Sequence, residues 1–164
     1  MTDERLGDDL WRALDALPRG GGVIFRHYAT PLAERRALFA RVAQVARRNR
    51  LVLIRAGAQR LGKADGVHGA AWCHHGDIRT WPAHSRREAL AGVRAGADLL
   101  LVSPIFATRS HPGAKALGRR AARAMIRGLD IPAIALGGMT ARRFRTLCGF
   151  YGWAAIDAWI TPDV

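Results

Sequence analysis

Short apolar runs alternate with helix-forming stretches along most of the chain, and this alternation limits the fold more than any other feature. Apolar runs occupy 23–25, 51–54, 99–102 and 132–136. Such continuous runs are typical of strands buried on both faces, and helices between them join parallel neighbours by right-handed crossovers. The sequence therefore predicts an α/β fold, either an open doubly wound sheet or a closed β/α barrel. Its 164 residues fit one core, so we expect a single domain over 1–164.

The helices between these runs have readable starts and ends. Thr30-Pro31 predicts a cap and a first-turn proline for a helix that runs to Asn49. Ser85 and Glu88 form a capping box that opens a helix through Ala95. Further helices are expected over about 118–129 and after Thr140, with short strands at 65–68 and 153–156 and a loop from Ser103 to about Leu117.

The residues that follow each strand are the candidate functional residues. In either α/β arrangement, ligands bind at the C-terminal ends of parallel strands. These positions are Arg26 to Tyr28, Arg55-Ala56, His68-Gly69, Ser103 to Phe106, Gly137 to Met139, and Asp157.

Two of these segments have the composition of anion-binding loops. Gly137-Gly138 lies between a strand and a helix start, where backbone N–H groups can approach a phosphate closely. A plain tight turn needs the same glycines, so both interpretations stay open. Thr108, Arg109 and His111 belong to a polar loop that either clamps an anionic substrate or is a solvated connection.

Histidines suggest proton transfer more than metal binding. His84 precedes the capped helix and could move protons near neutral pH, or it could simply belong to the helix start. The neighbouring histidines and cysteine lack the paired spacing of a zinc site, so we expect no metal there. This group comprises His68, Cys73, His74, His75 and His84.

The net charge of +13 favours anionic partners, and it comes almost entirely from arginine. The arginines are spread along helices without interleaved aromatic residues, which favours solvated helix faces over a nucleic-acid surface. Those assigned to such faces are Arg35, Arg36, Arg41, Arg47, Arg48 and Arg50. Two cysteines, no apolar run of 18 residues and a polar start give the expectation of a cytoplasmic protein without a membrane span.

Five strand-end segments resemble thiamine phosphate synthase and its relative, thiazole tautomerase. They are 23–28, 64–68, 96–98, 103–108 and 131–139, in matching order over nearly the whole chain. The resemblance implies a TIM-type β/α barrel that binds small phosphorylated thiazole and pyrimidine substrates. The synthase joins a pyrimidine pyrophosphate to a thiazole phosphate with magnesium assisting pyrophosphate departure, whereas the tautomerase moves protons with a histidine and no metal.

Position by position, the resemblance implies roles for several residues. Arg26 matches a synthase arginine and His84 the proton-moving histidine, so both are expected to be catalytic. The expected substrate and phosphate ligands are Thr108, Arg109, His111, Gly137, Gly138, Asp157, Arg55 and His68. The two magnesium carboxylates of the synthase are replaced by Ala56 and Cys73, so no metal is expected unless synthase activity is retained.

The resemblance also implies an incomplete barrel. Thr2-Asp3 matches the segment that ends the family's first strand, so that strand is expected to be missing or to lie upstream of this start, with short or absent helices after the third and fourth. Exposed strand edges associate readily, so a homo-oligomer could cover the gap.

Three functions follow from the resemblance. Metal-independent proton transfer on thiazole phosphate ranks first because the magnesium carboxylates are missing. Thiamine phosphate synthase is the alternative, and a non-catalytic protein that binds thiamine phosphates or regulates a synthase is the second alternative. A nucleic-acid-binding module ranks last.

Overall fold

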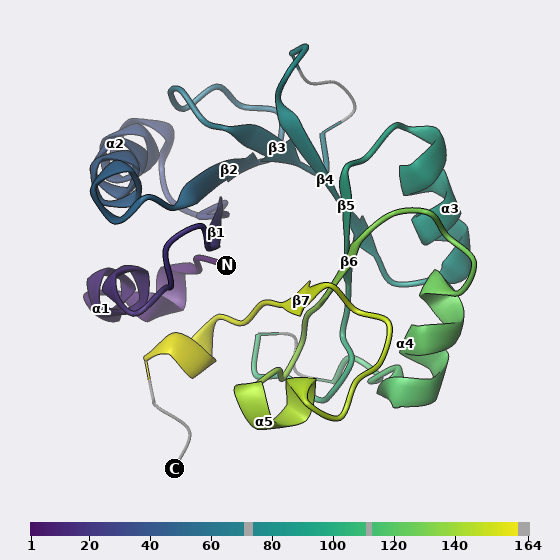
Figure 1. Cartoon of the computed structure of the whole chain (residues 1–164). Helices are drawn as coiled ribbons and strands as arrows, with labels where there is room; N and C mark the ends of the chain where they lie inside the picture. Colours follow the sequence, from purple (N-terminus) through teal and green to yellow (C-terminus); the bar gives the residue numbers. More distant parts are fainter. Residues whose placement is uncertain (71–73, 111–112, 161–164) are drawn as a thin grey trace. The chain divides into compact units, whose positions relative to one another are not determined.

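The computed structural model describes residues 1–70, 74–110 and 113–160. These residues divide into two compact units, one over Met1–Ile78 and the other over Arg79–Ala158. The strands of both are labelled in Figure 1. The expectation of a single domain over 1–164 stays a prediction.

The first unit is a parallel α/β arrangement in which consecutive strands are neighbours. β1 (Gly22–Phe25) pairs with β2 (Val52–Ala56), and β2 pairs with β3 (Gly66–His68), both in parallel. The helical elements are η1 (Glu4–Leu6), α1 (Asp9–Asp15) and α2 (Leu32–Asn49). The chain therefore passes from β1 to β2 through α2, the crossover that the sequence predicts.

The two faces of this sheet are distinguished by what packs on them. Phe25 lies edge-on to Phe39 of α2, with ring centroids 5.3 Å apart, so its side of β1 is covered by the helix. The strand register pairs Phe25 with Arg55 and Arg55 with Val67, which places all three on that face. Alternation puts Ala56 and His68 on the opposite face.

The second unit repeats the pattern. Its strands are β4 (Ile78–Ala83), β5 (Leu99–Val102), β6 (Ala133–Ala135) and β7 (Gly152–Trp153), each parallel to the next. Its helical elements are α3 (Arg86–Arg94), α4 (Gly118–Ile126), α5 (Ala141–Phe144) and η2 (Asp157–Trp159).

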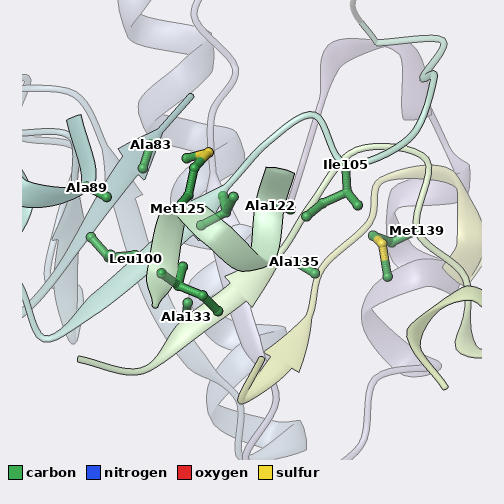
Figure 2. Packing of buried hydrophobic residues seen from close by; sticks show 11 residues of the cluster. Ala83, Ala89, Leu100, Ile105, Ala122, Met125, Ala133, Ala135 and Met139 are labelled. Atoms are coloured by element: carbon green, nitrogen blue, oxygen red, sulfur yellow. The ribbon is translucent and has the colours of Figure 1, made fainter. Parts of the chain in front are cut away.

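Small side chains let the helices of the second unit pack closely on its strands. Leu100 of β5 and Ala133 of β6 lie against Met125 and Ala122 of α4 in one buried cluster (Figure 2). A Cβ atom at Gly92 of α3 would lie 2.8 Å from the Trp81 ring, so glycine permits that contact. This packing holds the C-terminal ends of β4 to β7 in place, where the candidate ligands lie.

The described elements agree with most of the sequence-based expectations. No helix separates β2 from β3, and among the described residues none separates β3 from β4, as predicted. Thr2 donates its N–H to the Ile24 carbonyl at 2.8 Å, so the Thr2-Asp3 segment lies beside β1. Among the described helices, none is both long and apolar enough to cross a membrane.

Four local features were missed or wrongly predicted. α1 and β4 were not predicted, and β4 escapes notice because Arg79 and Pro82 interrupt its apolar pattern. α2 has Pro31 as its N-cap with no side-chain hydrogen bond, so Thr30 does not cap it. Arg35, assigned to a solvated helix face, is only 4% exposed.

Candidate functional site

The turn after β6 is held against the loop that follows β5. Ile105 and Phe106 donate their N–H groups to the carbonyls of Leu136 and Gly137 at 2.9 and 3.1 Å. Gly137 has a φ of +92°, and a Cβ atom there would lie 2.7 Å from Pro104 Cα. A Cβ atom at Gly138 would collide with the Ala107 carbonyl. Packing alone therefore requires both glycines.

Packing does not explain why the backbone N–H groups of this turn lack hydrogen-bond acceptors. Within the described part of the chain, those of Gly137, Gly138 and Met139 meet no hydrogen-bond acceptor, although Gly137 and Met139 are buried. Buried N–H groups are almost always paired, with protein, water or a ligand. Three adjacent free donors can surround the oxygens of one phosphate.

One cationic side chain, that of Arg143, contacts this turn, and another, that of Arg109, belongs to the loop after β5. Arg143 donates to the Gly138 carbonyl, and its guanidinium carbon lies 5.0 Å from the centre of the Phe106 ring. Arg109 contacts the Asp157 carboxylate through Nε at 3.2 Å and Nη2 at 3.1 Å. The structure thus brings two predicted phosphate ligands, Arg109 and Asp157, together as an ion pair.

The remaining residues of the polar loop are only partly placed. The Thr108 and Ser110 hydroxyls lie 3.0 Å apart, so Thr108 is part of a small local hydrogen-bond network. His111 lies outside the described residues, and its role as a phosphate ligand stays a prediction.

His84 stands at the start of α3, paired with a carboxylate. Its N–H donates to Glu88 Oε2 at 2.8 Å, and its Nδ1 lies 2.9 Å from the same oxygen. The backbone N–H of His84 is the largest of the causes that hold the pKa of Glu88 below its usual value. An ionised carboxylate only accepts hydrogen bonds, so Nδ1 carries a proton and Nε2 is the basic nitrogen of the neutral ring.

Arg26 and His68, in the first unit, lie at the C-terminal ends of β1 and β3. Arg26 contacts Asp3 at 3.6 Å, and its own N–H donates to Thr2 Oγ1 at 3.0 Å. Burial raises the pKa of Asp3, but hydrogen bonds from Arg5 outweigh it and leave the pKa below its usual value. Asp3 is therefore ionised and shared between Arg5 and Arg26.

Arg55 is not brought together with these two residues. It lies on the helix-covered face of β2, where its Nη1 donates to the carbonyls of Gly57 at 2.6 Å and Gln59 at 2.7 Å. Burial lowers its pKa from the ordinary value. The strand-end position agrees with the prediction from the sequence, and the role of Arg55 as a substrate ligand stays a prediction.

The residues at these strand ends do not fit a magnesium ion. Magnesium prefers carboxylate oxygens, and the side chains that end β1 to β3 on the face opposite α2 are Arg26, Ala56 and His68. Asp3 is engaged by arginines, and Asp65 accepts the Leu53 N–H at 2.8 Å, before β3 begins. Among the described residues, no three His, Cys, Asp or Glu side chains gather as a metal-ligand group.

Comparison with known proteins gives a consistent result. The family model described as thiamine monophosphate synthase matches residues 1–158. A thiamine-phosphate synthase of Chloroflexus aurantiacus is 39% identical over 84 residues, covering 49% of this chain and 39% of that protein. One of Geobacillus kaustophilus is 45% identical over 80 residues, covering 46% of this chain and 36% of that protein. These alignments span about two fifths of the relatives' length.

Similarity to a solved structure extends over the whole chain. A thiamine phosphate pyrophosphorylase from Pyrococcus furiosus superposes with a TM-score of 0.80 at 24% identity, covering 99% of this chain and 87% of that one. At this identity the similarity shows the fold. The predicted fold class, a TIM-type α/β fold with parallel strands, is thereby confirmed.

Proposed function

Because the chain belongs to the thiamine monophosphate synthase family, we propose that it binds a thiazole phosphate and joins it to a pyrimidine pyrophosphate. The observation that carries the phosphate part is the run of three free N–H groups at Gly137, Gly138 and Met139. The sequence ranked proton transfer above this reaction. The relatives, which are named thiamine-phosphate synthases, favour the reverse order.

The synthase reaction requires the protein mainly to position the two substrates and to supply positive charge. The pyrimidine compound has a carbon bonded to a pyrophosphate oxygen. That bond breaks, with the electron pair going to the oxygen, and the same carbon forms a new bond to the thiazole. The amides after β6 hold the thiazole phosphate, and Arg143, which donates to the Gly138 carbonyl, adds positive charge beside them. Arg26 is proposed to neutralise the charge that develops on the departing pyrophosphate.

A second candidate, proton transfer on the thiazole phosphate, is favoured by the His84–Glu88 pair. The carboxylate lies 2.9 Å from Nδ1, which orients the ring and leaves Nε2 to take a proton from one thiazole atom and return it to another. No metal takes part in this reaction.

One pair of assays separates the candidates. The protein is incubated with aromatic thiazole phosphate and pyrimidine pyrophosphate, in EDTA or in magnesium, and thiamine phosphate is measured. Separately, it is given the non-aromatic thiazole tautomer, and aromatisation is followed by absorbance. We expect thiamine phosphate to form, and His84→Gln to leave that rate within about threefold of the parent.

The tautomer assay has its own variant and control. If the second candidate holds, His84→Gln lowers aromatisation at least about a hundredfold, the scale of general acid–base catalysis, while the exposed His75→Gln does not. Binding of thiazole phosphate with neither product would identify a non-catalytic binding protein. Absence of binding would contradict the proposed function altogether.

A further inference from the structure

Two of the three peptide planes in the turn after β6 are held by main-chain donors. Ile105 donates its N–H to the Leu136 carbonyl at 2.9 Å, and Phe106 donates its N–H to the Gly137 carbonyl at 3.1 Å. Both donors are backbone groups of the loop after β5, so most side-chain substitutions in that loop leave them in place.

The third peptide plane, between Gly138 and Met139, is held by a side chain. Arg143 of α5 donates from Nη1 to the Gly138 carbonyl. A Cβ atom at Gly138 would lie 3.1 Å from that same nitrogen, so glycine lets the guanidinium come close. Within the described ranges, no main-chain donor reaches this carbonyl. The orientation of this plane therefore depends on Arg143.

Arg143 is itself fixed at both its main chain and its guanidinium. Thr140 Oγ1 accepts the Arg143 N–H at 3.2 Å. The guanidinium carbon lies 5.0 Å from the centre of the Phe106 ring, within cation–π distance, and Phe106 packs against the buried cluster of the second unit. The side chain is thus held in the position from which it reaches Gly138.

The contacts at the carbonyls decide where the N–H groups of the turn point. The peptide bonds of this turn are trans, and in a trans peptide the N–H points opposite to the C=O of the preceding residue. The bond from Arg143 to the Gly138 carbonyl therefore turns the Met139 N–H away from Arg143. In the same way, the N–H groups of Gly137 and Gly138 point away from the donors of the β5 loop.

We propose that Arg143 is a positioning residue, which orients the Met139 N–H toward the phosphate of the substrate. The hydrogen bond to Gly138 fixes the peptide plane before the ligand arrives, so less ordering is needed on binding. The same bond polarises the peptide and strengthens its N–H as a donor. The inference rests on the proposed function for the identity of the phosphate, but the order of the turn can be measured without a ligand.

The first measurement uses the free protein, in which ¹⁵N relaxation gives backbone order parameters. Arg143→Met should lower the order parameter of Met139 from about 0.85, the value of rigid backbone, toward about 0.6. The order parameter of Gly137 should stay unchanged, because Ile105 still holds its peptide plane. Arg142→Met is the matched control at an exposed neighbouring position of α5, and it should change neither value.

The second measurement is the binding of thiazole phosphate in EDTA, by calorimetry and by amide signals at saturation. Arg143→Met should weaken the affinity at least about fivefold, because an oriented donor to the anion is lost. At saturation, the shift of the Met139 amide should be smaller than in the parent, whereas that of Gly137 is kept. Arg143→Lys, which keeps the charge and a donor, should recover part of both, and Arg142→Met should keep both as in the parent.

Loss of charge alone predicts a different pattern. The affinity of Arg143→Met would then fall while the three amide shifts at saturation equal those of the parent, and this result would overturn the proposal. A lower melting temperature with unchanged affinity would indicate a structural role and would also overturn it.

The free-protein measurement separates this inference from the proposed function. If the parent protein does not bind thiazole phosphate, the proposed function is contradicted, and the order parameter of Met139 still decides whether Arg143 orients the turn. An unchanged order parameter in Arg143→Met overturns the inference in either case, even if thiazole phosphate binds and thiamine phosphate forms.

Discussion

At the scale of single residues, the glycines after β6 do two things. They admit the β5 loop, since a Cβ atom at Gly137 would lie 2.7 Å from Pro104 Cα, and they leave three N–H groups free. The first property is structural, whereas the second is the proposed binding surface. Substitution can separate them.

Replacing Gly137 should cost more stability than replacing a glycine of similar φ in open space. Gly137→Ala combines a left-handed backbone with a steric collision, and about 2–4 kcal/mol of unfolding free energy should be lost. Gly128, with a φ of +71° and no atom within 4 Å of its Cβ position, is the control. Gly128→Ala should lose about 1 kcal/mol. Equal losses in urea denaturation would show that the approach of Pro104 is unimportant.

The sequence located most candidate residues but not their partners. The polar loop predicts Arg109 and the strand-end rule predicts Asp157 as ligands, but a contact across 48 residues is invisible without the fold. The burial of Arg35 was missed because its neighbours on α2 suggest a solvated face. A difference of one position along the helix decides whether an arginine points to solvent or toward the strand ends. The His84–Glu88 pair was foreseeable from its i, i+4 spacing.

At the scale of elements, α3 shows how a readable start fixes a functional side chain. Ser85 Oγ accepts the Glu88 N–H at 3.2 Å, and Glu88 Oε2 accepts the His84 N–H at 2.8 Å. The capping box is as predicted, except that the glutamate reaches back one residue further, to His84. The hydrogen bonds that begin α3 therefore also hold His84, the candidate residue for proton transfer.

This pairing should make the stability of the protein depend on pH. The pKa of Glu88 is lowered by folding, so its contribution is present above the unfolded value and is lost as the pH falls through the lower folded value. Glu88→Gln should lower the unfolding free energy by about 1 kcal/mol at pH 7. The difference between variant and parent should shrink below about pH 4, in chemical denaturation at several pH values. A difference that is constant from pH 7 to pH 3 would contradict the ionised pair.

Elements with strong patterns were predicted best. β5 is a continuous apolar run, β2 begins with one, and α3 has a capping box. By contrast, β4 mixes Arg79, Thr80 and Pro82 with apolar residues and has no clear period. β4 is a strand because its neighbour β5 pairs with it from Thr80 to Ala83. Tertiary pairing of this kind overrides local propensity.

At the scale of the whole molecule, the alternation of strands and helices was sufficient to predict the fold class, and the strand-end motifs were sufficient to predict the family. The net charge of +13 agrees with phosphorylated substrates but does not by itself select them. Ranking the reactions from lost carboxylates gave proton transfer first, whereas the relatives favour the synthase. Cover of an open barrel edge by a homo-oligomer stays a prediction.

The most direct test of the account follows the backbone amides of ¹⁵N-labelled protein by NMR as thiazole phosphate is added in EDTA. The account predicts that the Gly137, Gly138 and Met139 amide signals shift together and saturate with one affinity. Saturable shifts confined to the three turn amides, with Gly128 unmoved, would support it. Unmoved turn amides at saturating thiazole phosphate would contradict it.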